Sequence, residues 1–376
     1  MTTGLRVAFD VTIARTNRMG SGMYARQLVD ALRPIMGERL SPIDFRYATP
    51  STQRKTARDR LATLAHDIWW TQVATLGAAH ACDARLLHMP TMLAPVRSSL
   101  PVVLTVHDLA IMRFPEKFRL WHRTCVSFFL PRLARTVDAI VTGSEATKAD
   151  LVDLLDVEPE RVYVIPYGIG SNFAPLPIDH PRLAEVRARY RLPRDYVISV
   201  GTIEPRKNLV RLLEAIKLLR SSGNGLSELR LVHAGPIGWR ADDVPRTATS
   251  LGLDEHVQFL GFVPDEDLAA LYQLARASIY PSLFEGFGFP VLEAMATGCP
   301  VVTANCSSMP EVAGDAAVLV DPRSVESIAD GIARVWSDDG LRRDLASRGL
   351  RRAAGYTWAA TARQTLRLYD HVLAST

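Results

Sequence analysis

The sequence contains few cysteines, and none of them is spaced as a structural pair. Cys82, Cys125, Cys299 and Cys306 are scattered, with no C-x-x-C among them. This distribution excludes a disulfide framework and a cysteine-based zinc site from the expected features. A reduced, cytoplasmic setting is the expectation that follows.

Long apolar runs are missing as well. No stretch of about 18 uncharged apolar residues occurs, so no transmembrane helix is expected. The first residues, MTTGLRVAFDV, enter a strand directly and lack the layout of a signal peptide.

Neither sign of charge dominates, since 44 Lys and Arg face 40 Asp and Glu for a net charge of +4. Residues 1–168 hold 21 basic and 16 acidic residues. The remainder therefore holds 44 − 21 = 23 basic and 40 − 16 = 24 acidic residues. We expect no nucleic-acid partner. For the basic N-terminal half, two alternatives stay open: an ordinary solvated surface, or peripheral contact with the inner face of a membrane or another anionic partner.

What the sequence does contain is an α/β alternation that runs twice. The chain has 376 residues, 48% of them hydrophobic, which suffices for two domains of ordinary size. The Gly- and Pro-rich segment 166–181 separates the two runs. We therefore expect two Rossmann-like parallel-sheet domains, residues 1–168 and 183–355.

The stretch Ala277–Ala304 organises the second domain, because its pattern is strand, glycine loop, helix, strand. Pro290 suits the start of the helix, and Gly298 suits its end. Ligands of open α/β sheets bind beyond the carboxyl ends of the strands. The glycine loop is expected to lie there.

The chemistry of this loop points to two kinds of ligand group. Gly286 and Gly288 permit close approach of the backbone, and the following helix N-terminus attracts anions. Glu285 and Glu293 bracket the loop, and carboxylates accept hydrogen bonds from sugar hydroxyls. The pattern predicts a site that binds a polyol and a phosphate together.

The string FEGFGFPVLEAMATGCPVV, with seven residues between Glu285 and Glu293, resembles the donor-site signature of the retaining GT-B glycosyltransferases of family four. The resemblance covers most of the chain and is strongest from Val197 to Asp321. It implies two Rossmann-like domains facing a cleft, with the last helix, residues 358–374, packing back on the first domain. It also implies sugar transfer with retention from a nucleotide diphosphate sugar to a hydroxyl acceptor, without cofactor.

The resemblance assigns roles to several positions. Arg206 and Lys207, at a strand-to-helix turn, would bind the diphosphate, and Glu293 would bind the ribose. Glu285 and the loop N–H groups would hold the donor sugar, which His107 would contact from the first domain. The cleft would close around the donor, with segment 166–181 as a hinge. The other donor-binding positions implied are Gly22, Gly201, Val263, Gly286, Phe287, Gly288 and Phe289.

Several alternatives stay open. An inverting enzyme would use His107, assisted by Asp108, as general base. A protein that only binds a nucleotide sugar and an epimerase of related fold are the alternatives to a transferase. The sequence of the glycine loop favours mannosyl or rhamnosyl transfer, with GDP-mannose or a similar donor and a saccharide or lipid-linked acceptor.

Asp265, Glu266 and Asp267 spell D-x-D, a metal motif of other glycosyltransferases. They open an apolar helix, where acidic residues are expected from capping and the helix dipole. We therefore expect no metal.

Two segments combine Arg and Lys with aromatic residues, namely 53–70 and 118–135. Each fits either an amphipathic helix on a membrane surface or a helix that packs its aromatics inward. For the pair Trp69 and Trp70 we expect inward packing.

Overall fold

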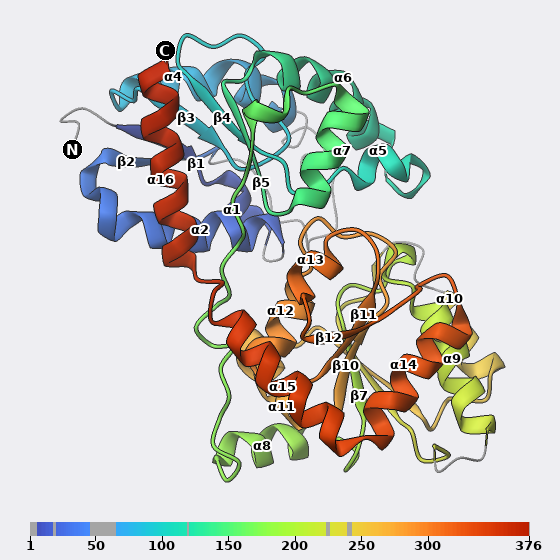
Figure 1. Cartoon of the computed structure of the whole chain (residues 1–376). Coiled ribbons are helices and arrows are strands. Elements are labelled where there is room, and N and C mark those ends of the chain that lie inside the picture. The colour runs from blue at the N-terminus through green and yellow to red at the C-terminus, as the bar shows by residue number, and fades with distance from the viewer. Residues whose placement is uncertain are drawn as a thin grey trace. The chain divides into compact units, whose positions relative to one another are not determined.

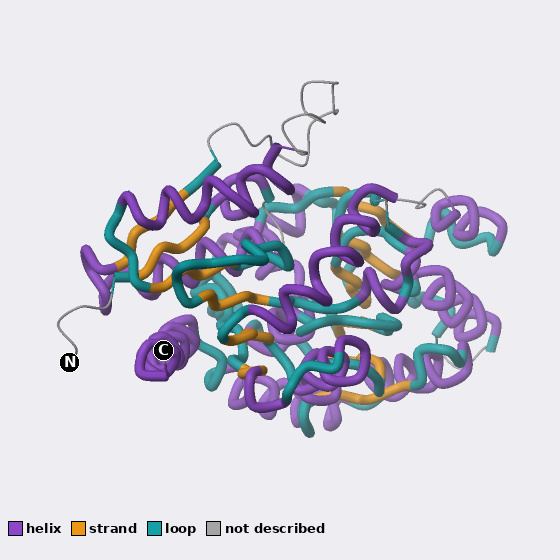
Figure 2. The backbone as a smooth tube through the Cα atoms, turned by 90° about the horizontal axis from the view of Figure 1, so that it is seen from above, coloured by secondary structure: helices purple, strands orange, loops and turns teal. Residues whose placement is uncertain are grey.

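The computed structural model describes residues 6–17, 20–45, 65–118, 120–222, 226–238 and 243–375. The chain forms two compact units, of which unit 1 comprises Met1–Gly168 and Thr357–Thr376, and unit 2 comprises Ile169–Tyr356. In each unit the strands lie inside and helices cover them (Figures 1 and 2).

Unit 1 is built on a parallel sheet of six strands within its described residues, in the order β2-β1-β3-β4-β5-β6. Most of these strands are buried along their whole length, as expected for a parallel sheet covered on both faces. Their bounds are β1 (Val7–Asp10), β2 (Leu40–Ile43), β3 (Leu86–Met89), β4 (Val102–Thr105), β5 (Ala139–Thr142) and β6 (Val162–Val164).

The helices of unit 1 place apolar faces on this sheet. In α2, the residues Leu28, Val29 and Leu32 share one face by sequence, and all three are buried. Ser144 caps α7 by accepting a hydrogen bond from the N–H of Thr147. The main helices are α1 (Thr12–Thr16), α2 (Ser21–Met36), the π-helix η2 (Ala65–Ala74), α4 (Thr75–Ala81), α5 (Ala110–Arg113), α6 (Leu120–Thr136) and α7 (Glu145–Leu155).

Unit 2 has a second parallel sheet of six strands in its described part, in the order β12-β11-β10-β7-β8-β9. The strands are β7 (Val197–Val200), β8 (Leu231–Ala234), β9 (Val257–Gly261), β10 (Ala277–Tyr280), β11 (Val301–Ala304) and β12 (Ala317–Val320). Its main helices are α8 (Pro181–Arg189), α9 (Leu209–Ser221), α10 (Asp243–Ser250), α11 (Asp265–Leu274), α12 (Phe289–Ala296), α13 (Met309–Ala313), α14 (Val325–Ser337) and α15 (Asp339–Ala353).

The last helix, α16 (Trp358–Ser375), belongs to unit 1 and lies beside α2 (Figure 1). Thr357 accepts a hydrogen bond from the N–H of Ala360 and so caps the helix. Its buried face runs from Trp358 to Val372 and includes Tyr369, whose hydroxyl lies 2.5 Å from Nδ1 of the buried His88. Leu366 and Leu373, which are partly buried, lie at the margin of this face.

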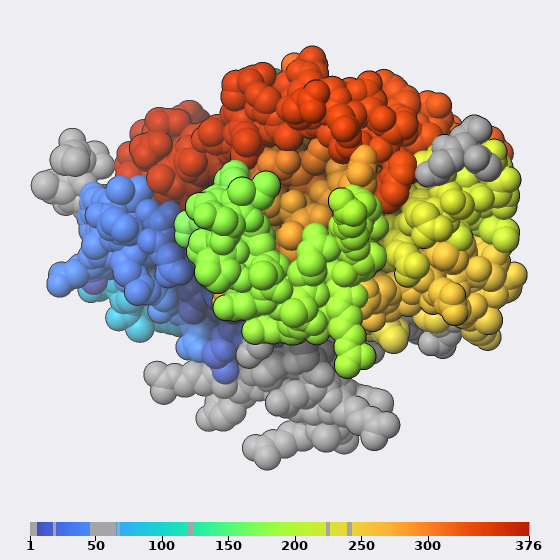
Figure 3. Space-filling model, turned by 90° about the horizontal axis from the view of Figure 1, so that it is seen from below, coloured from blue at the N-terminus to red at the C-terminus, as the bar shows by residue number. Residues whose placement is uncertain are grey.

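The chain crosses from unit 1 to unit 2 after Gly168 and returns to unit 1 after Tyr356. At the first crossing, a Cβ on Gly168 would lie 2.1 Å from the backbone nitrogen of Trp358, so only glycine fits. On the unit 2 side, the N–H of Ile169 donates to the carbonyl of Tyr356 at 3.0 Å. The segment that follows and α8 lie on the surface of unit 2, in green in Figure 3.

Asp267 has a structural role that differs from the expected capping. The N-cap of α11 is Pro264, and no side chain caps this helix. Asp267 is 1% exposed and forms ion pairs with Arg182 and Arg189, both at 2.7 Å, while Tyr190 donates to it at 2.7 Å. The carboxylate therefore fastens α8 to α11, and the acidic first turn also suits the helix dipole.

The Trp pair divides between core and surface, so the expectation that both pack inward is wrong for Trp69. Trp70 is buried and donates its indole N–H to Asp10 at 3.2 Å, whereas Trp69 is 54% exposed. The preceding basic residues, 53–64, lie outside the described residues. Across the described ranges, no helix is both long and apolar enough to cross a membrane.

Candidate active site

The sheet of unit 2 has a topological switch point between β7 and β10. The chain runs from β7 outward to β8 and β9, then returns to the other side of β7 as β10. At such a point the loops after the two strands diverge and leave a crevice at the carboxyl ends, where ligands of open α/β sheets bind. Arg206 and Lys207 follow β7, and Glu285 follows β10.

Glycines shape the turn after β7. Gly201 has φ +136°, and a Cβ on Gly201 would lie 3.6 Å from Cε of Lys207. Gly235, after β8, must also lack a side chain, because its Cβ would lie 1.9 Å from the carbonyl oxygen of Gly201. The turn η5 (Pro205–Lys207) then presents the two cationic side chains over the sheet edge.

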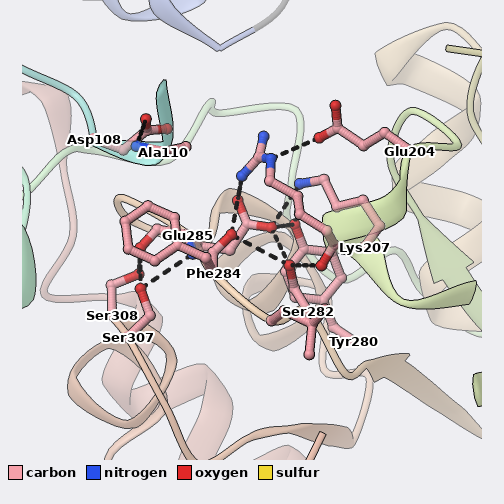
Figure 4. A network of polar contacts seen from close by, with 12 residues as sticks. Asp108, Ala110, Glu204, Lys207, Tyr280, Ser282, Phe284, Glu285, Ser307 and Ser308 are labelled. Atoms are coloured by element: carbon pink, nitrogen blue, oxygen red, sulfur yellow. Dashed lines mark hydrogen bonds and ion pairs between the residues drawn. The ribbon is translucent and has the colours of Figure 1, made fainter. Parts of the chain in front are cut away.

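Glu285 lies at the centre of a hydrogen-bonded network (Figure 4). Its Oε1 accepts from Lys207 Nζ at 2.7 Å, from the Tyr280 hydroxyl at 2.8 Å and from the Ser282 hydroxyl at 2.6 Å. Its Oε2 accepts from Arg206 at 2.8 Å. With both carboxylate oxygens engaged and the residue 6% exposed, Glu285 is held tightly.

A second carboxylate, that of Glu204, binds Arg206 on the Nε side of its guanidinium group. Its Nε forms an ion pair of 2.7 Å with Glu204, and its Nη1, which contacts Glu285, also donates to the carbonyl of Phe284 at 3.0 Å. The guanidinium is therefore held in one orientation by groups from two loops.

The electrostatics of the cluster follow from its burial and its charges. Burial alone would raise the pKa of Glu285, but the charges of Arg206 and Lys207 outweigh it and lower that pKa to about 2. Burial lowers the pKa of Lys207, and Glu285 opposes this effect. The carboxylate thus favours the charged form of a largely buried lysine.

Two serines after β11 hold the backbone of Glu285. Ser307, in the left-handed region at φ +55°, accepts from the N–H of Glu285 at 3.1 Å and donates to its carbonyl at 2.5 Å. Ser308 donates to the same carbonyl at 3.0 Å. A serine in the left-handed region costs about 1 kcal/mol or more of backbone strain. The two hydrogen bonds between Ser307 and the backbone of Glu285 offset that cost.

The glycine loop leads directly into α12. Gly288, at φ +95°, is the N-cap, and Pro290 occupies the second helical position rather than the expected first. Phe287 is buried against the rings of Phe289 and Tyr356, with centroids 5.2 and 6.0 Å away. The arrangement offers two fixed cations and a helix N-terminus at one sheet edge, which suits a phosphate-bearing ligand.

Two family models match the chain in succession. "Glycosyltransferase Family 4" matches residues 10–172, and "Glycosyl transferases group 1" matches residues 185–352. The O-antigen chain mannosyltransferase B of Escherichia coli is 34% identical over 290 residues, which cover 76% of this chain and 74% of that protein. This chain belongs to the family 4, group 1 glycosyltransferases.

Solved structures agree on the fold of this glycosyltransferase, which is GT-B. Sucrose-phosphate synthase of Thermosynechococcus elongatus aligns with TM-score 0.79 and 19% identity, over 99% of this chain and 100% of its own. Anabaena HepE, in complex with UDP and glucose, aligns with TM-score 0.75 and 17% identity, over 97% and 99%.

One set of relatives is much longer than this glycosyltransferase. The serotype-specific mannosyltransferase WbdA of Escherichia coli is 29% identical over 384 residues, covering 96% of this chain but 45% of WbdA. The chain therefore spans less than half of WbdA.

Glu293 occupies a different environment from Glu285. It lies on α12, 8% exposed, and accepts a hydrogen bond from the buried Tyr272 at 3.1 Å. Burial raises its pKa to about 7, Tyr272 opposes the rise, and the charge of Asp265 adds to it. The two glutamates of the signature thus differ in protonation near neutral pH.

This raised pKa predicts a pH dependence of stability. A carboxyl group whose pKa is higher in the folded than in the unfolded protein stabilises the folded state. This contribution is fully present below the unfolded-state pKa and is lost as the pH rises through the folded-state pKa. As the pH rises from 5 to 8, the parent chain should therefore lose a stabilising contribution that Glu293→Gln does not have. The difference in free energy of unfolding between the two should shift in favour of Glu293→Gln by about 2–3 kcal/mol over this range. Urea unfolding at both pH values measures the change, with the exposed Glu228→Gln as control. A difference that does not vary with pH contradicts the prediction.

His107 follows β4 in unit 1 and is partly buried. Its Nδ1 lies 3.0 Å from the Tyr167 hydroxyl and its Nε2 lies 3.1 Å from the carbonyl of Pro90, so Nε2 carries the proton and donates. Burial lowers its pKa to about 4, although Pro90 and Asp108 oppose the shift. The ring is neutral near pH 7.

The alternative of an inverting base, His107 assisted by Asp108, does not match this geometry. Asp108 accepts from the N–H of Ala110 at 2.9 Å, and both ring nitrogens of His107 have other partners. The dyad is therefore not formed in the described structure.

Two more predicted positions have structural explanations. Gly22 lies in the first turn of α2 rather than in a loop, and its Cβ would lie 1.7 Å from the carbonyl oxygen of Asn17. Val263 is buried just after β9, while the neighbouring Phe262 is 58% exposed.

Among the described residues, no group of three or more His, Cys, Asp or Glu side chains lies close enough together to bind a metal ion.

The sequence interpretation missed the uncharged members of the network. Tyr280 and Ser282 lie inside the quoted stretch Ala277–Ala304, where Tyr280 counted only as an apolar strand residue. A hydroxyl at the carboxyl end of a buried strand was the available signal. Ser307, Ser308 and Tyr272 gave no signal, because their role depends on contacts across the fold.

Proposed function

We propose that this glycosyltransferase moves a hexose, with mannose as the first candidate, from a nucleoside diphosphate sugar to a saccharide or lipid-linked hydroxyl. The observation that carries the proposal is the cation pair Arg206 and Lys207, fixed on Glu285 at the switch point of unit 2. Mannosyl transfer is supported by the names of relatives, among them the O-antigen chain mannosyltransferase B. GDP-mannose is the proposed donor.

The proposed roles follow the charge that develops during transfer. As the glycosidic bond breaks, negative charge grows on the leaving diphosphate, and Arg206 and Lys207 stabilise it. Glu293 accepts hydrogen bonds from the ribose hydroxyls, and the loop N–H groups of Gly286–Phe289 hold the sugar. Glu285 keeps the two cations in place. His107, as a neutral hydrogen-bonding group, contacts the transferred sugar.

The proposal includes retention and independence from metal. Two fixed cations can serve the diphosphate in the way that a divalent ion serves it elsewhere. Retention is supported by the Glu285-x7-Glu293 signature and is checked by the anomeric configuration of the product in NMR.

The decisive measurement is release of nucleoside diphosphate from GDP-mannose, UDP-glucose and related donors, with and without a panel of mannose-containing acceptors. We expect acceptor-dependent release that is largest with GDP-mannose and survives EDTA. Conversion of the donor without acceptor would indicate an epimerase, and tight binding without turnover would indicate a binding protein. Activity abolished by EDTA and restored by magnesium or manganese would contradict metal independence.

We further propose that α6 of unit 1 contacts an anionic membrane. Within Leu120–Thr136 there are three arginines and no acidic residue, and Leu120 and Phe128 are 74% and 50% exposed. Arg132 lies over the ring of Phe128, 3.8 Å from its centroid. A basic helix with exposed apolar side chains binds at the interface of such a bilayer.

Replacing Arg132 and Arg135 by Gln should weaken sedimentation with phosphatidylglycerol-containing vesicles roughly 30-fold at low salt, since each basic residue near such a surface contributes about 1 kcal/mol. The matched control replaces Arg343 and Arg351 of α15, which changes the net charge equally. Equal loss in both variants would mean that net charge alone drives binding, and the surface assignment would be wrong.

A further inference from the structure

Glu204 is the member of the charge cluster to which no role has been assigned. It lies between β7 and η5, and its side chain is 30% exposed. Its carboxylate pairs with Arg206 Nε at 2.7 Å, on the edge of the guanidinium opposite to the contact with Glu285 (Figure 4). Glu204 lies near the proposed phosphate site without belonging to the Glu285-x7-Glu293 signature.

The charges of the cluster cancel. Arg206 and Lys207 supply two positive charges, while Glu204 and Glu285 supply two negative ones within ion-pair distance. Glu285 pairs with the largely buried Lys207 at 2.7 Å and holds it in place. Glu204 is less buried, and Arg206 keeps its contacts with Glu285 and Phe284 without it. Its charge is therefore not required to compensate a buried cation.

A carboxylate beside a phosphate site has two physical effects. It orients the guanidinium through a charge-assisted hydrogen bond, which fixes where the other donors of Arg206 point. It also repels a bound polyanion, because like charges within a few ångströms interact strongly where water is partly excluded. The first effect favours transfer, and the second weakens retention of the nucleoside diphosphate product.

We propose that Glu204 is a positioning residue for Arg206 and that its charge sets how readily the nucleoside diphosphate product leaves. The proposal rests on the proposed function, since it takes Arg206 and Lys207 as the diphosphate site. A cluster without this second carboxylate would carry a net positive charge and hold the product. A cluster with it is formally neutral until the donor arrives.

Glu204→Gln separates the two effects, because the amide oxygen still accepts from Arg206 while the charge is gone. We expect the Kd for GDP and for UDP, measured by calorimetry, to fall about tenfold, and product inhibition to strengthen to match. The gain should shrink with added salt, since the interaction is electrostatic. Glu160→Gln, an exposed site in unit 1, makes the same change in net charge and should leave both constants unchanged.

Glu204→Ala removes the acceptor as well as the charge. We expect its kcat/KM for the donor to fall at least tenfold below that of Glu204→Gln, because the guanidinium edge is no longer held. Equal kcat/KM in the two variants overturns the positioning role. A Glu204→Gln protein that binds nucleoside diphosphate no more tightly than the parent chain overturns the role in product release.

A failure of the proposed function gives a different result. Binding of GDP or UDP to the parent chain, with a loss of that binding in Arg206→Ala, establishes the site before Glu204 is tested. If Arg206→Ala binds both nucleotides as well as the parent chain, the diphosphate does not bind here, whatever Glu204 does.

Discussion

Replacing Arg206 and Lys207 together by alanine is expected to reduce kcat/KM by 10³-fold or more, since removal of a single preorganised donor at a developing charge costs roughly 10²–10³-fold. Both side chains are fixed before any ligand arrives, because Glu285 binds each of them at 2.7–2.8 Å. Fixed donors need no reorganisation as the charge moves to the leaving diphosphate. Single-turnover kinetics with saturating acceptor measure the loss.

The same double variant also tests what the pair does for stability. Without its cations, Glu285 is a buried carboxylate with only hydroxyl partners, and breaking a buried ion pair costs about 3–5 kcal/mol. Adding Glu285→Gln to the double variant removes the uncompensated charge. We expect the triple variant to regain most of the stability and none of the activity.

This rescue distinguishes loss of fold from loss of chemistry. A double variant that is folded, by near-UV circular dichroism, and that transfers sugar at the parent rate would refute the assignment of the diphosphate site. A triple variant that stays as unstable as the double one would show that the ion pairs are not the cause of the instability.

Glu285→Gln alone is the second large effect, and it should show in the pH profile. Burial already lowers the pKa of Lys207, and the charge of Glu285 limits that fall. Without the charge, Lys207 should lose its proton at lower pH, so activity should decline on the alkaline side earlier than in the parent chain. We expect turnover to fall about 100-fold at pH 8, with a smaller loss at pH 6.

Ser282→Ala is the matched control, because it removes a hydroxyl that donates to the same carboxylate oxygen at 2.6 Å and leaves every charge in place. It should cost about 1 kcal/mol of stability and leave the shape of the pH profile unchanged. If Glu285→Gln and Ser282→Ala have the same pH profile, Glu285 does not act through the charge of Lys207.

Acid unfolding supplies an independent check on Glu285. Its folded pKa, about 2, lies below the ordinary value, so its contribution to stability is present above pH 4.5 and is lost as pH falls through 2. Glu285→Gln should therefore be less stable than the parent chain at neutral pH. The difference between the two should narrow steadily as the pH falls below 4.5.

The fold was accessible from the sequence because its signals are local. Alternating buried strands and amphipathic helices, with Gly288 and Gly298 at helix ends, follow from backbone preferences and periodicity. The family-four GT-B fold and the glycosyltransferase activity were predicted from one string around Glu285, and the comparisons confirmed both.

The arrangement of the site depends on contacts that no local pattern encodes. Arg206 and Glu285 are 79 positions apart, and the sequence assigned each to a different part of a ligand rather than to one another. Asp267 shows the same limit, since its partners Arg182 and Arg189 lie on another helix. Trp69 and Trp70 are neighbours of identical type, so only the packed structure separates the exposed one from the buried one.

The two crossings at residues 168–169 and 356–357 make unit 2 an insertion within unit 1. During ribosomal synthesis, residues 169–356 can therefore finish folding while unit 1 still lacks α16. Until residues 357–376 emerge, His88 has no hydroxyl from Tyr369 beside it, and the face of α2 that α16 covers is open. On stalled ribosomes, unit 2 should become resistant to protease first, and the half that begins the chain should be completed last.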